Sequence, residues 1–248
     1  MMGKLAELVQ NSRRTVAFTG AGVSTLSGIR DFRGRNGVYT TGWHGMQVEE
    51  ILSIDCFTRH PELFYEWAKE FVYSLDDFAP SAVHLALAGL EKIGRLAGGV
   101  YTQNIDLLHT RAGSRNVFEI HGSPATHRCL KCGHTQGYEP VAAIVMKGEV
   151  PRCPECGGLV KPNIVFYGEM LDENLLERGF DEFSTADLVL VMGSSLTVHP
   201  AAGLPETAAR NGVKLVIVNE QPTHLDRFAA LRMESLAEAA AELDTVTA

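Results

Sequence analysis

The sequence predicts an α/β fold: a Rossmann-like doubly wound parallel sheet with a smaller inserted zinc-binding domain. Six short apolar, β-branched runs recur along the 248 residues, helical stretches lie between them, and four cysteines form two close pairs. Near-continuous apolar runs are typical of strands buried on both faces, as in a parallel sheet covered by helices. Such sheets bind ligands beyond the carboxyl ends of their strands.

The predicted strands lie in segments that each end in small or polar residues. In chain order these are TVAFTGAG (15–22), GGVYTQNID (98–106), NVFEIHG (116–122), NIVFYGE (163–169), DLVLVMGSS (187–195) and KLVIVNE (214–220). Helical patterns cover 81–94, 200–212 and 236–248, and the second of them ends at Gly212. The polar tails of the six strands are therefore the candidate site.

Composition excludes several classes of protein. The formal net charge of -8 argues against a protein that coats nucleic acid, because non-specific binding needs clustered positive charge. No apolar run reaches the roughly 20 residues that a membrane span needs, and the N-terminus carries no signal-peptide pattern. We expect a cytoplasmic protein without direct nucleic-acid or membrane partners.

The paired cysteines predict a metal site. Cys129-x-x-Cys132 and Cys153-x-x-Cys156 are typical of a zinc centre in a reducing compartment, and Cys56 stands apart from them. Four thiolates fill a tetrahedral shell, so the metal would be structural. A nucleic-acid-binding zinc ribbon is disfavoured, because residues 124–161 carry modest basic charge and few aromatic residues.

The first predicted strand runs into a glycine-rich turn, Gly20-Ala21-Gly22. This turn could receive a pyrophosphate, although Thr25 stands where a dinucleotide fingerprint has its third glycine. Taken alone, the motif also fits a plain tight turn. A simple dehydrogenase is disfavoured, because a long polar segment (30–48) follows and no hydride acceptor is evident.

Taken together, the motifs resemble those of the sirtuins, the NAD-dependent protein-lysine deacylases. The resemblance covers roughly residues 5–240, so the chain is similar to a minimal, bacterial-type sirtuin that consists of the catalytic core. It is carried by GAGVSTLSGIRDFRG, TQNIDLLH, HG, the two cysteine pairs, KPNIVFYGE, GSSLTV and VIVN. It implies a deacetylase that converts NAD and acetyl-lysine proteins or peptides to free lysine, nicotinamide and O-acetyl-ADP-ribose, with a structural Zn²⁺.

The resemblance also implies which residues bind the co-substrate. The expected pyrophosphate, ribose and cofactor-loop contacts are Gly20, Ala21, Gly22, Ser24, Thr25, Asp31, Phe32, Arg33 and Gln103. The expected nicotinamide pocket is Asn104, Ile105 and Asp106, and the expected adenosine contacts are Gly193, Ser194, Ser195 and Asn219.

His121 matches the catalytic histidine of the family, and an imidazole that titrates near neutral pH suits a general base. Val165, Phe166 and Tyr65 match substrate-contacting positions. Sirtuins that remove succinyl groups resemble one another in a Tyr-x-x-Arg pair, whereas this chain has Tyr65 followed by Ala68. We therefore expect poor removal of succinyl groups.

The chain departs from the family pattern at Arg30, where proline is usual, and this departure predicts a more flexible cofactor loop. The expected domains are a discontinuous NAD-binding domain (1–30, 70–123 and 162–248), a cofactor loop with a helical insert (31–69) and a zinc module (124–161). The sequence leaves three alternative functions open: mono-ADP-ribosyl transfer, removal of longer neutral acyl groups, and a non-catalytic NAD-sensing module.

Overall fold

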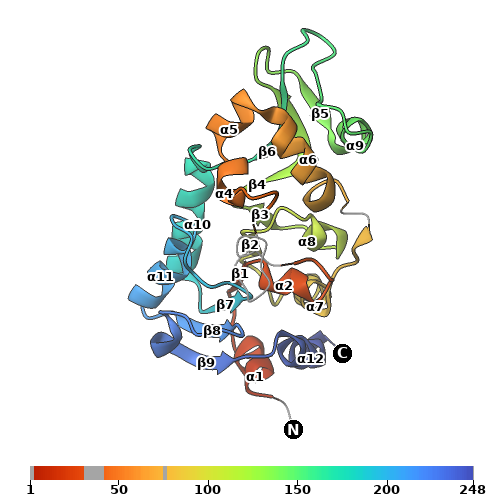
Figure 1. The fold of residues 1–248 in the computed structure, drawn as a ribbon. Helices are drawn as coiled ribbons and strands as arrows, with labels where there is room; N and C mark the ends of the chain where they lie inside the picture. The colour runs from red at the N-terminus through yellow and green to blue at the C-terminus, as the bar shows by residue number, and fades with distance from the viewer. Residues whose placement is uncertain (1–2, 31–41, 75–76, 248) are drawn as a thin grey trace.

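The structure, a computed structural model, describes residues 3–30, 42–74 and 77–247. These residues form two stacked units (Figure 1). The larger unit contains the parallel sheet together with the first and last helices, and the smaller unit contains an antiparallel sheet and a group of short helices. The predicted fold class is confirmed.

Six strands form the parallel sheet of the described residues, in the order β3-β2-β1-β7-β8-β9. Five of them are predicted strands: β1 Thr15–Thr19, β2 Val100–Thr102, β3 Val117–Glu119, β7 Leu188–Met192 and β8 Lys214–Val218. The chain leaves β1 for β2 on one side and later returns to β7 on the other. Loops that follow β1 and β7 therefore diverge at the carboxyl edge, which is where such sheets bind ligands.

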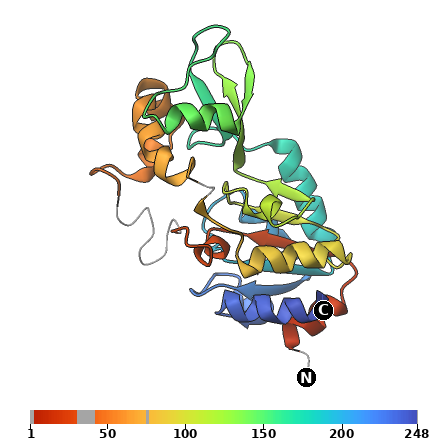
Figure 2. The same cartoon turned by 90° about the vertical axis from the view of Figure 1, so that its right-hand side faces the viewer.

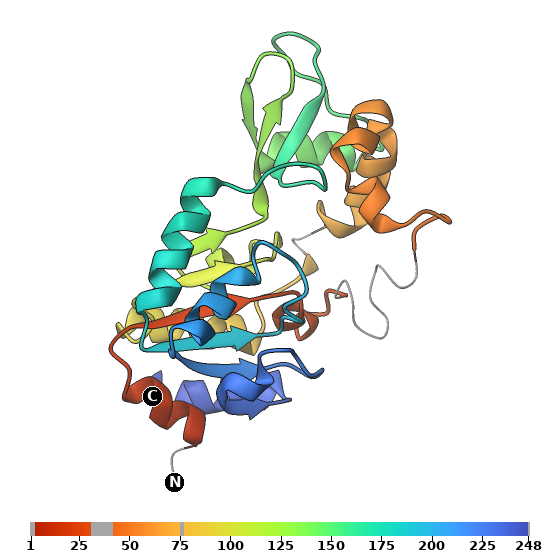
Figure 3. The same ribbon diagram turned by 90° about the vertical axis from the view of Figure 1, so that its left-hand side faces the viewer.

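Helices cover both faces of this sheet. One face carries α1 (Lys4–Gln10), α7 (Ala82–Lys92) and α12 (Leu236–Thr247), and Figure 2 shows the last two side by side. The other face carries α10 (Glu173–Thr185) and α11 (Gly203–Arg210), which Figure 3 shows. Within β1, Ala17 faces the first layer whereas Val16 and Phe18 face the second. All three side chains are fully buried, as expected for a central parallel strand.

The smaller unit combines two parts of the chain that lie far apart in sequence. Its antiparallel sheet has the order β5 (Thr135–Gly137), β4 (Gly122–Cys129) and β6 (Val160–Ile164), with α9 (Tyr138–Val145) beside it. Helices α4 (Val48–Ile51), α5 (Ile54–Arg59) and α6 (Pro61–Phe71) share its apolar cluster. In that cluster the ring of Phe166 lies 5.3 Å from Phe57 and 4.9 Å from Phe64, between ring centroids. The predicted helical insert and zinc module thus pack around one core, and the domain boundaries themselves stay a prediction.

The sequence assigned one strand to the wrong sheet and missed another strand. The segment 163–169 was expected in the parallel sheet, but β6 ends at Ile164 and pairs antiparallel with β4. The sixth parallel strand is β9 (Ala229–Met233), which follows the 3-10 turn η2 (Asp226–Phe228). Most of the β9 side chains are half-buried at the sheet edge, and its sequence, AALRM, lacks the β-branched residues that mark its neighbour β8.

Within the ranges that the structure describes, no helix has the length and apolar character needed to cross a membrane.

Candidate active site

A cavity of about 460 Å³ opens at the carboxyl edge of the parallel sheet, beneath the smaller unit. This volume lies in the range of small-molecule and cofactor sites. Its lining comes from the loops after β1, β2, β3, β7 and β8 and from the segment that follows β6. Both units therefore contribute walls, and the cavity includes the switch point between β1 and β7.

The floor of the cavity depends on a close contact between two backbone turns. The amide of Gly22 donates to the carbonyl oxygen of Gly193 over 2.9 Å. A Cβ atom on Gly22 would lie 2.7 Å from the Cα of Gly193, and a Cβ on Gly20 would lie 2.7 Å from the Gly193 oxygen. Gly193 also has a φ of +64°, which disfavours residues with a side chain. These positions require glycine because the two turns contact each other there, and all three glycines line the cavity.

A buried polar network lies behind the turn after β1. Asn104 donates through Nδ2 to the Gly20 carbonyl and to the Ser24 hydroxyl, both over 3.1 Å. The Ser24 hydroxyl donates to Asp106 over 2.6 Å, and the second Asp106 oxygen accepts from the Leu108 amide over 2.9 Å. The network fixes the Asn104 side chain, which lines the cavity, whereas Ser24 and Asp106 lie behind the lining.

Hydrogen bonds also connect the loops after β2 and β7. The Ser194 hydroxyl donates to Gln103 Oε1 over 2.8 Å and accepts from the Leu196 amide over 3.3 Å. The backbone N–H of Gln103 donates to the Thr19 carbonyl and so continues the pairing of β2 with β1. Gln103 and Ser194 therefore place their side chains together on one wall of the cavity.

His121 lies between β3 and β4 and lines the same cavity. Its Nδ1 is 2.9 Å from the carbonyl oxygen of Gln103. Because a carbonyl can only accept, this contact places the proton of the neutral ring on Nδ1. Nε2 is then the nitrogen that takes up a proton, which is the arrangement a general base requires.

The smaller unit supplies the opposite wall as a single continuous segment, residues 164–169. The Val165 amide donates to the carbonyl oxygen of His121 over 2.8 Å. Farther along, the Tyr167 amide donates to Leu52, and the Tyr167 carbonyl accepts from Ile54. This wall is therefore tied both to the histidine and to the helices of the smaller unit.

The structure brings most of the predicted site residues together. Those that line the cavity are Gly20, Ala21, Gly22, Thr25, Gln103, Asn104, Ile105, His121, Val165, Phe166, Gly193, Ser194, Ser195 and Asn219. Asp31, Phe32 and Arg33 lie outside the described residues.

Among the described residues, three that were predicted to contact NAD or substrate do not line the cavity: Ser24 and Asp106, which lie behind Asn104, and Tyr65. Tyr65 is buried in the apolar cluster of the smaller unit, and its hydroxyl donates to the Val160 carbonyl over 2.5 Å. Ala68 is fully buried in the same cluster. Both residues lie behind the wall rather than on it.

Sequence reasoning missed several lining residues. They are Leu52, Ile164, Tyr167, Gly168, Glu169, Leu171, Val198, His199, Pro200, Gln221 and Leu236. Most of these side chains carry no chemistry that a motif would single out. Glu169 could have been noticed, because it ends an apolar run. A carboxylate in that position is often partly buried, and a buried carboxylate usually has a charged partner.

Two other histidines have structural surroundings. His127 Nε2 lies 2.7 Å from the Tyr73 hydroxyl, and burial lowers the pKa of His127 to about 4. His109 Nε2 lies 2.9 Å from the Thr19 hydroxyl, and burial lowers its pKa well below the ordinary value. Neither residue lines the cavity, and both are expected to stay neutral at physiological pH.

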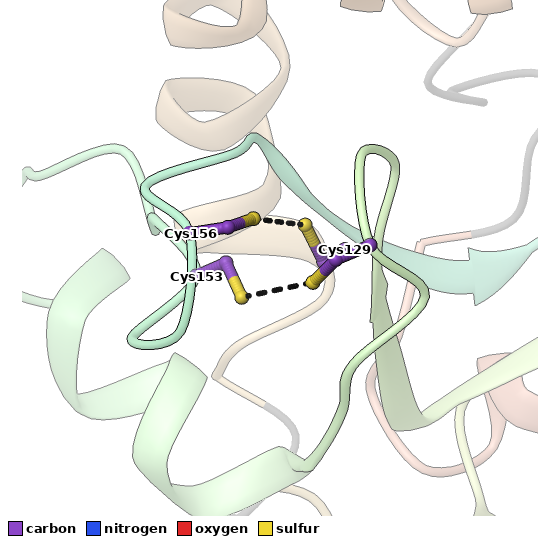
Figure 4. Close-up of side chains that lie close together, drawn as sticks. Cys129, Cys153 and Cys156 are labelled. Atoms are coloured by element: carbon purple, nitrogen blue, oxygen red, sulfur yellow. Dashed lines mark hydrogen bonds between the residues drawn. The ribbon is translucent and has the colours of Figure 1, made fainter.

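The four cysteines of the two pairs converge at the far end of the smaller unit. Their sulfur atoms all lie within 4.8 Å of one another. Figure 4 shows Cys153 and Cys156 facing the loop that carries Cys129, and the contacts are 3.5 Å for Cys129–Cys156 and 3.6 Å for Cys132–Cys153. Tetrahedral Zn–S bonds of ~2.3 Å place sulfurs ~3.8 Å apart, so this geometry fits a zinc ion.

Electrostatics at the cluster also call for a cation. Backbone amides of Cys132 and Lys131 lower the pKa of the Cys129 thiol to about 6. The His134 amide also favours the Cys132 thiolate, but contacts with the neighbouring sulfurs outweigh it and raise the pKa of Cys132 to about 12. A bound cation would offset the mutual repulsion of thiolates held this close together. The ion would close the β4–β5 hairpin onto the Cys153–Cys156 turn.

Comparison with known proteins identifies relatives along nearly the whole chain. The Sir2 family matches residues 20–200. An NAD-dependent protein deacetylase of Thermotoga maritima is 44% identical over 231 residues, which cover 93% of this chain and 92% of the relative. The NAD-dependent protein deacylase 2 of Archaeoglobus fulgidus is 44% identical over 225 residues, which cover 90% and 86%.

Solved structures agree with the sequence comparison. A Sir2 structure with deacetylated p53 peptide and 3'-O-acetyl ADP ribose has a TM-score of 0.90 at 41% identity, covering 98% of this chain and 96% of that chain. A structure of Sir2 with p53 peptide and NAD+ has a TM-score of 0.87 at 40% identity, covering 99% and 97%. Fold and sequence thus point to the same family.

Replacing Cys132 by alanine tests the metal centre. We expect the variant to lose bound zinc and to melt about 6–12 °C lower, because metal binding supplies folding free energy and a loss of ~3 kcal/mol shifts a chain of this size by that much. Elemental analysis and thermal melting measure both effects. Cys56→Ala is the matched control, since this half-buried thiol lies outside the cluster. A Cys132→Ala protein with one zinc per chain and an unchanged melting temperature would contradict the assignment.

Proposed function

This chain belongs to the Sir2 family and is an NAD-dependent protein deacetylase, and we propose that its reaction takes place in the cavity at the carboxyl edge of the parallel sheet. The observation that carries the proposal is the position of His121. Its ring lines the cavity with Nδ1 held by a carbonyl, between the glycine floor and the 164–169 wall.

The glycine floor suits the pyrophosphate of NAD. Gly20 and Gly22 leave no room for side chains and let an extended ligand approach the backbone. Ser194, Ser195 and Asn219 line the side beneath β7 and β8, where we place the adenosine half. The nicotinamide half then lies toward Asn104 and Ile105, with Asp106 and Ser24 holding Asn104 from behind.

The acetyl-lysine enters between the floor and the 164–169 wall. The Val165 amide is already bonded to His121, so the group that Val165 can offer a substrate N–H is its carbonyl oxygen. Phe166 and Ile105 give this part of the cavity apolar surface that suits a lysine methylene chain and an acetyl group. We therefore propose acetyl-lysine proteins or peptides as partners, as in the relatives solved with p53 peptides.

NAD is consumed here as a co-substrate. It supplies a ribose whose bond to the positively charged nicotinamide breaks readily and which accepts the acetyl group. The amide oxygen of acetyl-lysine would bond to C1′ of that ribose as the bond to nicotinamide breaks. His121 would take a proton through Nε2 from a neighbouring ribose hydroxyl, whose oxygen then bonds to the acetyl carbon. Cleavage of the carbon–nitrogen bond would release lysine, and water would replace that nitrogen on the carbon. With one water consumed, the products are lysine, nicotinamide and O-acetyl-ADP-ribose, and the cytoplasm is the proposed site of the reaction.

Replacing His121 by alanine tests the proposed base. We expect kcat for deacetylation to fall by about 10²- to 10⁴-fold, because general-base catalysis typically supplies that much. NAD affinity should stay within about 2-fold, since the ring is proposed to move a proton rather than to provide binding energy. Nicotinamide release and mass detection of O-acetyl-ADP-ribose measure the reaction, and titration with NAD measures binding.

His199→Ala is the matched control for this experiment. His199 also lines the cavity, but its ring contacts Glu206 and is largely exposed, so turnover should be retained. Near-normal deacetylation by the His121 variant would contradict the assignment. ADP-ribose attached to the protein substrate, in place of O-acetyl-ADP-ribose, would favour mono-ADP-ribosyl transfer.

The charge of the lining predicts which acyl groups are removed. Among the described lining residues there is no lysine or arginine, and Leu52, Ile105, Ile164 and Phe166 are apolar. A succinyl carboxylate would lose its hydration without gaining a cationic partner. We expect kcat/KM to be roughly 10²-fold lower for succinyl-lysine than for acetyl-lysine on one peptide. Propionyl-lysine, which adds size without charge, should stay within about 10-fold of acetyl-lysine, and equal values for acetyl and succinyl would refute the expectation.

A further inference from the structure

Lys161 is a buried cation that the proposed chemistry does not use. It lies in β6 with 5% of its surface exposed. Its ammonium contacts Glu169 Oε2 at 2.9 Å and donates to the carbonyl oxygens of Pro162 at 3.2 Å and Ile164 at 2.6 Å. It also lies 4.0 Å from the centroid of the Phe166 ring. Oxygen atoms and the face of an aromatic ring thus surround the charge.

These contacts span the wall that faces the proposed substrate. The Glu169 oxygen that receives Lys161 also accepts from the Phe166 amide over 2.8 Å. The Glu169 amide donates to the Phe166 carbonyl over 2.9 Å and closes a turn. Gly168 allows this turn with a φ of +92°. One ammonium therefore holds the start of the wall at Ile164, its middle at Phe166 and its end at Glu169.

Other anchors hold the wall elsewhere. The Val165 amide is bonded to His121, and Tyr167 is bonded on both sides to the helical segment at Leu52 and Ile54. These bonds fix the wall relative to its neighbours, whereas Lys161 fixes how its own residues fold on one another. Because removing one partner of a buried ion pair leaves an uncompensated charge, the wall depends on both members.

We propose that the Lys161–Glu169 pair is the positioning device that shapes the 164–169 wall for the acyl-lysine substrate. This inference rests on the proposed function, because it assigns the wall to peptide rather than to NAD. Both residues act through the wall and are positioning residues. Loss of the pair should weaken the binding of acetyl peptide and leave the binding of NAD unchanged, because the hydrogen bonds and ion pair described above join residues of β6 and the wall to one another.

Glu169→Gln is the test, because glutamine keeps the size of the side chain and can still accept from the Phe166 amide. We expect the KM for an acetyl-lysine peptide to rise about 10-fold or more, with the KM for NAD within about 2-fold of the wild-type value. A calorimetric Kd for the peptide should shift by a similar factor. A merely structural role would lower the melting temperature without separating the two KM values.

Glu182→Gln is the matched control. Glu182 forms a two-point ion pair with Arg14, with both contacts at 2.8 Å, next to the amino end of β1 and so away from the cavity. This variant should retain both KM values. The double variant Lys161→Met/Glu169→Gln removes both charges and should regain thermal stability while its peptide KM stays high.

Two results would overturn the inference: an active Glu169→Gln enzyme with the wild-type peptide KM, or a double variant that regains the wild-type peptide KM together with its stability. Failure of the proposed function would be seen separately, in the wild-type protein. That protein would then release no nicotinamide from NAD in the presence of acetyl peptide.

Discussion

The contact between the backbone turns after β1 and β7 is the constraint on which the cavity depends. Gly22 and Gly193 approach so closely that a side chain on either residue would overlap the other turn. The two strands are neighbours at the switch point of the sheet, and their loops then diverge. The amide of Gly22 and the carbonyl of Gly193 join the floor at this point. The loops that carry Asn104 and Ser194 are placed against this floor by hydrogen bonds to Gly20 and to Gln103.

The smaller unit completes the site, because it faces this floor with a wall of its own. The wall follows directly from β6, whose sheet is closed at its far end by the four cysteines. Its aromatic core joins that sheet to helices α4, α5 and α6, which come much earlier in the chain. The cysteine cluster, the aromatic core and the wall are therefore parts of one packed unit. The Val165–His121 bond connects this unit to the histidine, so the proposed substrate wall directly adjoins the proposed base.

Much of this arrangement could be predicted from the sequence, because the informative residues have few structural alternatives. Cysteine pairs at this spacing indicate one geometry, whereas the glycine turn fits either a plain tight turn or a pyrophosphate site until the other motifs are considered with it. Other features could not be predicted, since the pattern is shared by different structures. The apolar run at 163–169 fits a parallel strand as well as the end of an antiparallel one, and β9 (AALRM) lacks the β-branched residues that mark a buried strand. Tyr65 matches a motif, yet its burial depends on packing that no local pattern encodes.

The most direct test of the central claim is the NAD affinity of Gly193→Ala measured against Gly212→Ala. Both glycines have positive φ, +64° and +72°, but only at Gly193 would a Cβ meet other atoms, 2.5 Å from the Val23 amide. The two substitutions therefore impose similar backbone strain, but only Gly193→Ala also introduces a clash with the neighbouring turn. If the floor holds NAD, Gly193→Ala should bind NAD about 10- to 10²-fold more weakly while still folded, since losing a backbone hydrogen bond to a charged pyrophosphate costs about 1.5–3 kcal/mol, and Gly212→Ala should bind normally. Equal NAD affinities in two folded variants would contradict the account.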